Sequence, residues 1–153
     1  MVNKILFTAD WHLKLGQKNV PVTWAKNRFN LFIEQIKELE TKADLHIIGG
    51  DLFDRVPSME ELELYFKFIS NVGIKTIIFD GNHEATRKGK TFFTQLKSAT
   101  TRLNPLVEIV DDIYKGEQFG ILPYRELHRK WHITQFNNRQ PLFTHVRGAI
   151  PPH

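Results

Sequence analysis

The sequence contains no cysteine among its 153 residues. Disulfide bonds, thiolate nucleophiles and cysteine-ligated zinc are therefore excluded, which fits a reducing cytosol. Long apolar runs are also missing, since none approaches the roughly 18 residues that a membrane-spanning helix requires. The first residues, MVNKILFTAD, lead straight into a strand-like run without the layout of a signal peptide. We therefore expect a soluble, cytoplasmic protein without membrane contact.

A large excess of charge of one sign is missing as well. The 21 Lys and Arg residues against 17 Asp and Glu residues give a formal net charge of +4. Such a mild excess suits a polyanionic partner such as nucleic acid, although many other proteins share it. Hydrophobic residues make up 41% of the chain, which is enough for one sizeable core at this length. We expect a single domain over residues 1–153.

Three short apolar runs, at residues 4–8, 45–48 and 75–79, predict buried parallel strands. Between the first two, apolar side chains recur in steps of three and four along residues 23–41, which predicts a core-facing helix. The side chains on that face are Ala25, Phe29, Phe32, Ile36 and Leu39.

A second helix is predicted to begin at Ser58, because Ser58 and Glu61 have the spacing of a capping box. The resulting order β-α-β-α-β implies right-handed crossovers between neighbouring strands. The sequence therefore predicts a layered α/β fold, in which a mainly parallel sheet is flanked by helices and covered on both faces.

The second half of the chain gives weaker signals. A short helix is predicted over residues 91–99, and the runs VEIV, FGIL and PLFTHV are candidates to continue the sheet. The last residues, RGAIPPH, form turns directly after a strand-like run, where a complete domain more often ends in a docked element. We therefore expect the fold to be incomplete at its C-terminus.

Each of the first three predicted strands runs into a polar cluster. The clusters are Asp10-Trp-His12, Asp51-Leu-Phe-Asp54 and Asn82-His83-Glu84. Because the carboxyl ends of parallel strands share one edge of an open α/β sheet, we expect the clusters to converge. Carboxylate and amide oxygens with imidazole nitrogens, and no sulfur, suit manganese, iron or zinc. Each residue alone is also compatible with a turn, a helix cap or a structural histidine, but together they predict a metal site.

Four other residues near these clusters have simpler interpretations. Asp80 and Glu84 are expected to hold the turn or accept hydrogen bonds rather than to act in catalysis. His46 lies inside a strand run, where a hydrogen-bonded buried histidine is more common than a metal ligand. Trp11, between two candidate ligands, is expected to pack beneath the site or to contact substrate.

The order of the polar clusters resembles the calcineurin-like metallophosphoesterases. That family has the pattern D-x-H, G-D-x-x-D, G-N-H-[DE], a lone His and G-H-x-H, and this sequence has ADWH, GGDLFD, GNHE and FTHV. DWHL followed by GDLFD most resembles the SbcD-type nuclease subunit of bacterial and phage DNA recombination complexes, over almost the whole chain. The fifth block has no counterpart before His153, so we expect the domain to be cut before its last metal-ligand motif.

The resemblance implies a role for each matching residue. Asp10 and His12 would bind one divalent cation, Asn82 and His145 would bind a second, and Asp51 would bridge both. Manganese is the expected metal, with magnesium, iron and zinc as alternatives. A hydroxide bridging the two metals would attack phosphorus in line. His83 would be the catalytic imidazole, oriented by Asp54.

Basic residues follow the first and third clusters: Lys14, Lys18, Arg87, Lys88 and Lys90. They are candidates to bind the phosphates of DNA beside the metals, and each is equally compatible with an exposed loop. From the resemblance we expect a DNA nuclease of recombination and repair in a bacterial or phage-infected cell. Its expected partners are an SbcC-type ATPase and a second copy of itself.

Two other functions stay open. GDLFDR and GNHE also resemble the blocks of serine/threonine phosphatases, in which Arg55 would bind the substrate phosphate. Against this, Val56-Pro57 replaces the glycine that follows the arginine, and DWHL lacks the glycine of the phosphatase block. Without the fifth block, a non-catalytic module that binds DNA or an ATPase is a further alternative. Because the missing block would add one histidine ligand to each metal, we expect this chain alone to bind manganese weakly and to hydrolyse DNA poorly.

Overall fold

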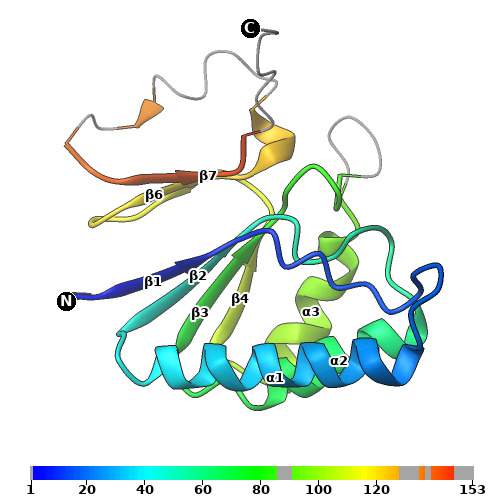
Figure 1. Ribbon diagram of the computed structural model, residues 1–153. Helices are drawn as coiled ribbons and strands as arrows, with labels where there is room; N and C mark the ends of the chain where they lie inside the picture. Colours follow the sequence, from blue (N-terminus) through cyan, green and yellow to red (C-terminus); the bar gives the residue numbers. More distant parts are fainter. Residues whose placement is uncertain (1, 86–90, 128–134, 137–138, 147–153) are drawn as a thin grey trace, which may run out of the picture.

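The computed structural model describes residues 2–85, 91–127, 135–136 and 139–146 (Figure 1). Its helices are α1 (Val22–Glu40), α2 (Met59–Ser70) and α3 (Phe93–Leu103), with a 3₁₀ turn η1 (Tyr124–Glu126). The larger sheet contains β1 (Ile5–Thr8), β2 (Leu45–Gly49), β3 (Lys75–Phe79) and β4 (Val107–Val110). The smaller sheet contains β5 (Tyr114–Lys115), β6 (Gly120–Leu122) and β7 (Leu142–Thr144). Among the described residues, no helix combines the length and the apolar character that a membrane crossing requires.

The larger sheet is wholly parallel, and its strands lie in the order β1-β2-β3-β4. Each crossover advances to the next strand in the same direction, so right-handed connections place every helix on the same face. Figure 1 shows α1, α2 and α3 together beneath the sheet. The predicted α/β fold with a mainly parallel sheet is therefore confirmed.

The smaller sheet covers the opposite face of the larger one (Figure 1). Its strands β5 and β6 are antiparallel, whereas β6 and β7 are parallel. Of the three strand-like runs in the second half, VEIV continues the larger sheet as β4. The expectation that FGIL and PLFTHV also continue that sheet is wrong, because they pair with each other as β6 and β7. Because the strands follow one another in sequence order, the helices all cover one face of the larger sheet. The smaller sheet buries the apolar side chains on the other face.

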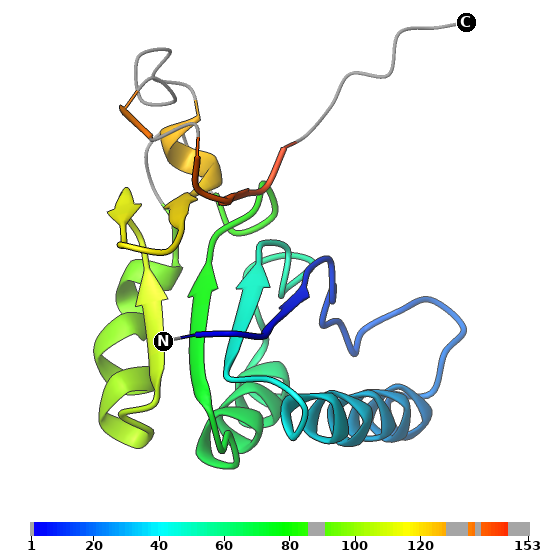
Figure 2. The ribbon, with the colours of Figure 1, turned by 90° about the vertical axis from the view of Figure 1, so that its left-hand side faces the viewer.

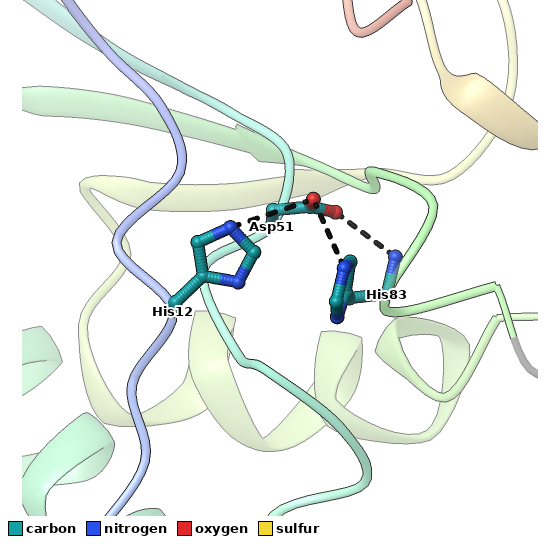
Figure 3. Close-up of side chains that lie close together, drawn as sticks. All are labelled: His12, Asp51 and His83. Atoms are coloured by element: carbon teal, nitrogen blue, oxygen red, sulfur yellow. Dashed lines mark hydrogen bonds and ion pairs between the residues drawn. The ribbon is translucent and has the colours of Figure 1, made fainter. Parts of the chain in front are cut away.

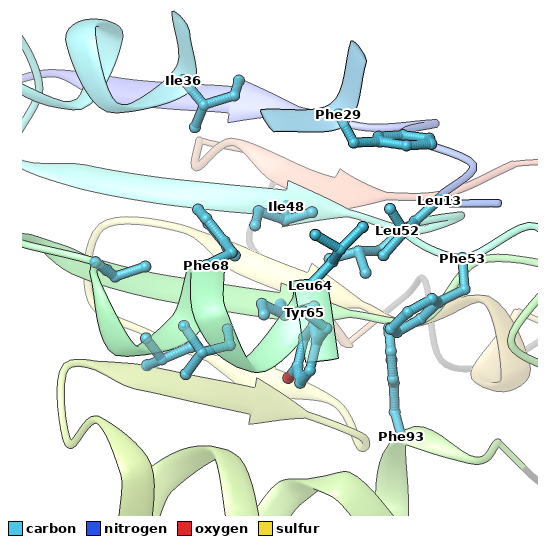
Figure 4. Close-up of a cluster of buried hydrophobic side chains, with 14 of the residues drawn as sticks. Leu13, Phe29, Ile36, Ile48, Leu52, Phe53, Leu64, Tyr65, Phe68 and Phe93 are labelled. Atoms are coloured by element: carbon cyan, nitrogen blue, oxygen red, sulfur yellow. The ribbon is translucent and has the colours of Figure 1, made fainter. Parts of the chain in front are cut away.

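Two hydrophobic cores follow from these layers. The larger core lies between the helices and the sheet (Figure 4), and its members include Phe29, Ile36, Ile48, Leu64, Phe68 and Ile78. The smaller core lies between the two sheets and contains Leu45, Ile47, Ile77, Phe79, Val110, Phe119 and Ile121. Successive residues of β2 and β3 alternate between the two cores, as the pleat of a strand requires.

The helix boundaries are close to those predicted. The capping box at the start of α2 is confirmed, because the Ser58 hydroxyl accepts from the Glu61 amide while the Glu61 carboxylate accepts from the Ser58 amide. The predicted buried face of α1 is wrong at its last residue, Leu39. Leu39 is 44% exposed, and the neighbouring Glu40 is 4% exposed instead.

Candidate metal centre

The candidate site lies where β1, β2, β3 and β7 end. Figure 2 shows the loops that follow the first three strands at the same edge of the larger sheet. The smaller sheet contributes to this edge because β7 ends at Thr144, directly before His145. The Thr144 hydroxyl donates to the carbonyl of Leu122 on β6 at 2.8 Å, which anchors the end of β7.

The loops after β1 and β2 run side by side. The amide of Asp10 donates to the Gly50 carbonyl at 3.1 Å, and the amide of His12 donates to the Asp51 carbonyl at 2.9 Å. Three candidate ligands have left-handed backbones, with φ of 55° at Asp10, 45° at His12 and 51° at Asp51. Non-glycine residues in this region cost about 1 to 3 kcal/mol each, and such strain concentrates at functional sites.

Two glycines allow these loops to approach one another. A Cβ at Gly81 would collide with the carboxylate of Asp51. Gly50 has a φ of 84°, and a Cβ there would lie 2.6 Å from Nδ1 of His145 and 2.7 Å from the Cα of Gly81. The glycines of GGD and GNH are therefore required by the close packing of backbone and ligand side chains.

Asp51 lies at the centre of the site (Figure 3) and is 3% exposed. Its Oδ2 atom is 3.8 Å from Nε2 of His12, 3.8 Å from Nε2 of His83 and 3.4 Å from Nε2 of His145. Its Oδ1 accepts from the His83 amide at 2.9 Å. Three imidazoles from three different loops thus surround one buried carboxylate.

The electrostatics of this centre follow from that arrangement. Burial acts to raise the pKa of Asp51, but the hydrogen bonds from His145 and from the His83 amide hold it below its usual value. The same contact with Asp51 raises the pKa of His145 to about 9. A cation that binds His145 must therefore displace its proton.

The candidate ligand atoms form two groups that share Asp51. Among the described residues, one group is His12, Asp51 and His83, and the other is Asp10, Asp51 and His145, with ligand atoms within 4.8 Å of one another. Asn82 joins the second group, because its Oδ1 lies 3.1 Å from Nε2 of His145. The five predicted ligands thus lie together, and His83, predicted as a non-ligand, lies beside them.

This set of donors fits a pair of divalent cations. The buried Asp51 carboxylate belongs to both groups, and its Oδ2 faces the imidazoles of both, as expected for a ligand shared by two cations. Nδ1 of His12 is buried without a hydrogen-bond partner, and its nearest acidic neighbour is Oδ1 of Asp54 at 3.5 Å. Mixed oxygen and nitrogen ligands without sulfur suit manganese, iron or zinc.

His83 is held by Asp54, but not through the Asp54 carboxylate. Nδ1 of His83 lies 2.6 Å from the main-chain carbonyl of Asp54. Because a carbonyl only accepts, Nδ1 carries the proton in this contact and Nε2 faces the site. The Asp54 carboxylate binds Nζ of Lys14 at 2.6 Å, and this contact holds the pKa of Asp54 below its usual value.

The candidate phosphate-binding residues differ in whether an acidic side chain already pairs with them. Lys14 is paired with Asp54, whereas Lys18 is exposed on the loop between β1 and α1. Arg55 contacts the Glu61 carboxylate with both terminal nitrogens, at 2.9 Å and 3.1 Å. The remaining three candidates lie outside the described residues: Arg87, Lys88 and Lys90.

Glu84 holds two of the loops together, as expected for a residue outside the chemistry. Its carboxylate is fully buried and accepts from the amides of Asp51 at 2.9 Å, Phe53 at 2.8 Å and Gly81 at 2.8 Å. Burial raises the pKa of Glu84 to about 7, although these hydrogen bonds oppose the shift. Asp80 is also buried, and its Oδ2 accepts from the amide of Arg125 at 3.3 Å.

The site opens into a cavity of about 390 Å³. Its lining consists of Phe7, Ala9, Asp10, His12, Gly49, Asp51, Asn82, His83, Thr144, His145 and Val146. Sequence reasoning missed Phe7, which is 44% exposed and packs on Phe143 with ring centroids 5.3 Å apart. It also missed Tyr124, whose ring lies 6.3 Å from that of His145. Neither aromatic carries a signal in the sequence, because both contacts depend on the second sheet.

Comparison with known proteins identifies a family and relatives of this chain. Residues 3–147 match the family model described as calcineurin-like phosphoesterase. The chain is also 38% identical, over 159 residues, to a protein of Escherichia phage T5 named probable exonuclease subunit 1. That match covers 98% of this chain and 47% of the phage protein, so the chain spans about half the length of this relative.

Proposed function

The chain belongs to the calcineurin-like phosphoesterase family, and on that premise we propose that it is a metal-dependent nuclease that hydrolyses DNA phosphodiesters. The observation that carries this proposal is the buried Asp51 carboxylate, shared by two groups of candidate ligands. The name of the phage T5 relative, an exonuclease subunit, supports a nuclease over other phosphoesterases.

In this proposal Asp10, His12, Asp51, Asn82 and His145 hold two divalent cations, with manganese as the expected metal. The cations, when bound, supply Lewis acidity toward the phosphate and lower the pKa of the attacking water. Asp51 is preorganised for its role, because its Oδ1 is already fixed by the His83 amide while its Oδ2 faces three imidazoles. The strained backbones of Asp10, His12 and Asp51 are consistent with loops shaped by ligand geometry.

His83 is proposed as the acid that protonates the leaving oxygen or stabilises its charge. Its Nδ1 is anchored on the Asp54 carbonyl, so its Nε2 is directed into the cavity. The side chain is 36% exposed, which leaves it accessible to a substrate. A positioned acid of this kind contributes on the order of 10²- to 10⁴-fold to the rate.

The substrate and partners follow from the family resemblance. We propose that Lys18, Arg87, Lys88 and Lys90 contact phosphates that flank the scissile bond, while Lys14 acts mainly through Asp54. We further propose that the protein works in the cytoplasm, in a DNA recombination complex with an SbcC-type ATPase and a second copy of itself. The word subunit in the name of the phage T5 relative is consistent with such an assembly.

The phosphatase alternative is weakened by Arg55. In that hypothesis the Arg55 guanidinium must bind the substrate phosphate, but both of its terminal nitrogens contact the carboxylate of Glu61. The Glu61 side chain is 1% exposed and also accepts from the amide of Leu15 at 2.7 Å. Releasing Arg55 would leave a buried carboxylate without its cation, which is costly.

The test is hydrolysis by the parent chain and by Asp51→Asn with Mn²⁺. Four substrates are compared: single-stranded DNA, double-stranded DNA, a phosphopeptide and bis(p-nitrophenyl) phosphate. We expect the parent to cleave DNA and the phosphodiester slowly, and Asp51→Asn to cleave neither. Cleavage of the phosphopeptide alone would support a phosphatase, and no metal-dependent hydrolysis of any substrate would support a non-catalytic module.

A further inference from the structure

Trp11 lies between two candidate ligands whose backbones are both strained. Asp10 precedes it with a φ of 55°, and His12 follows it with a φ of 45°. Such conformations persist only where the surrounding structure enforces them. Whatever fixes Trp11 therefore also fixes the direction of the two ligands.

Packing provides part of this restraint. The Trp11 ring makes edge-on contacts with Phe32 of α1 and Phe68 of α2, with ring centroids 5.0 Å and 5.1 Å away. Trp11 thus packs beneath the site, which is one of the two roles expected from its place in the sequence. The N–H of a buried tryptophan usually also makes a polar contact, which restrains the ring within its own plane.

A partly buried chain of hydrogen bonds supplies that contact. Nε1 of Trp11 donates to Oγ1 of Thr8 at 3.1 Å, and Oγ1 of Thr8 lies 2.8 Å from Nε2 of His46. Nδ1 of His46 lies 2.8 Å from Oε1 of Glu40. One arrangement of protons uses every donor and acceptor: Trp11 donates to Thr8, Thr8 donates to His46, and His46 donates to Glu40. His46 is thus a hydrogen-bonded buried histidine, as expected.

The far end of this chain is firmly anchored. Glu40 is the last residue of α1 and is 4% exposed, and His46 in β2 is fully buried. An apolar pair would fill the same space without the cost of burying a carboxylate. The hydrogen bonds instead fix the orientation of the side chains, because each one restrains the direction of the next side chain in the series. The restraint on Trp11 therefore originates outside the cavity, in α1 and β2.

We propose that the chain Glu40–His46–Thr8–Trp11 is a positioning device that holds Asp10 and His12 in metal-binding geometry. None of these four residues is among those that line the cavity, and they act through the backbone on both sides of Trp11. The inference rests on the proposed function, because Asp10 and His12 are metal ligands only within it. It assigns a role in metal affinity to residues that are not themselves metal ligands.

The test compares Thr8→Val with Thr8→Ser. Valine keeps the shape of threonine but removes both hydrogen bonds, whereas serine keeps the hydroxyl. Thr76→Val is the control, because Thr76 also lies in the larger sheet, but its hydroxyl donates to the Ile74 carbonyl at 3.2 Å and is not part of the contacts of Trp11. Free Mn²⁺ is followed by electron paramagnetic resonance during a titration of each folded variant. Urea unfolding of each variant measures its stability separately.

We expect Thr8→Val to bind Mn²⁺ about 10-fold more weakly or worse, since lost support of a metal ligand typically costs 10- to 100-fold in affinity. Thr8→Ser and Thr76→Val should bind Mn²⁺ within about twofold of the parent. Trp11→Phe keeps an aromatic ring in place but removes the first hydrogen bond, and it should weaken binding in the same way. It serves as the test variant if Thr8→Val does not fold.

A second readout needs no metal. In nuclear magnetic resonance spectra of the metal-free protein, the Trp11 indole proton should exchange slowly with water in the parent and Thr8→Ser, and quickly in Thr8→Val. The inference is overturned if the Thr8→Val and Trp11→Phe variants that fold bind Mn²⁺ as the parent does, or if Thr76→Val weakens binding equally. Failure of the parent itself to bind Mn²⁺ would refute the proposed function. The exchange of the indole proton would then decide alone whether the hydrogen bonds from Glu40 to Trp11 restrain the Trp11 ring.

Discussion

Glu84→Gln is the most informative single substitution at the site, because it changes one atom of a buried clamp. In the parent, Oε2 of Glu84 accepts from the amides of Asp51 and Gly81, and Oε1 accepts from the amide of Phe53. Glutamine has one carbonyl oxygen and one NH₂ group, so at least one amide would face another donor. The best orientation keeps the two bonds at one oxygen and loses the bond to Phe53.

The magnitude follows from that geometry. An unsatisfied buried amide costs about 1 to 3 kcal/mol, and replacing a charged acceptor by a neutral one weakens each remaining bond by roughly 1 kcal/mol. Removing the buried charge offsets part of this loss, since burial already raises the pKa of Glu84 to about 7. We expect a net destabilisation of about 2 to 3 kcal/mol, which lowers Tm by roughly 4 to 12 °C in a chain of this size.

The assay is urea unfolding at neutral pH, followed by circular dichroism, with Glu108→Gln as the control. Glu108 lies on β4 and is exposed, so its substitution should change the free energy of unfolding by less than about 0.5 kcal/mol. Manganese affinity is measured in parallel, because the clamp fixes the backbone of Asp51. If Glu84→Gln is as stable as Glu108→Gln, the three hydrogen bonds do not hold the loops together and the reasoning is wrong.

Three further predictions concern other parts of the site. Gly81→Ala should abolish Mn²⁺ binding in a calorimetric titration, because its Cβ would collide with the Asp51 carboxylate. His83→Ala should retain Mn²⁺ while hydrolysis falls by about 10²- to 10⁴-fold, and loss of both would make His83 a ligand. The pKa of Glu61 lies below its usual value, because bonds from Leu15, Ser58 and Arg55 outweigh burial. The ionised Glu61 therefore stabilises the fold above pH 4.5, the pKa of the unfolded state, and this stabilisation is lost as the pH falls below that value. Glu61→Gln should accordingly make the free energy of unfolding depend less on pH in the acidic range, as measured by urea unfolding.

The sequence predicted the helices and strands that form from interactions between residues close together in the chain. Short continuous apolar runs and helical periodicity predicted β1 to β3 with α1 and α2, and the strand order then placed the polar clusters at one edge. The second sheet was not predicted, because short strands such as β6 do not reveal their partner. The exchange of Leu39 for Glu40 in the core also escaped prediction. It depends on a contact between Glu40 and His46, and propensity does not encode such a contact.

The residues of the candidate site were predictable from the sequence, but the contacts between them were not. The residue types of Asp10, His12, Asp51 and Asn82 at three strand ends predicted a metal centre, and the family resemblance added His145. The assignment of contacts within the site needed coordinates. Asp54 holds His83 through its backbone, and no pattern of side chains encodes such a contact. The roles of the individual ligands stay predictions until a metal titration is made.

Counting manganese ions bound to the parent chain, to Asp51→Asn and to Asp111→Asn tests the central claim most directly. Asp111 is paired with Lys97 at 2.7 Å and is not part of the cavity lining, so it controls for the loss of a negative charge. The account predicts that Asp111→Asn binds manganese as the parent does. It also predicts that Asp51→Asn loses both cations, because its carboxylate is shared by the two groups of ligands. Undiminished manganese binding by folded Asp51→Asn would contradict the shared-carboxylate centre and the two-metal function proposed from it.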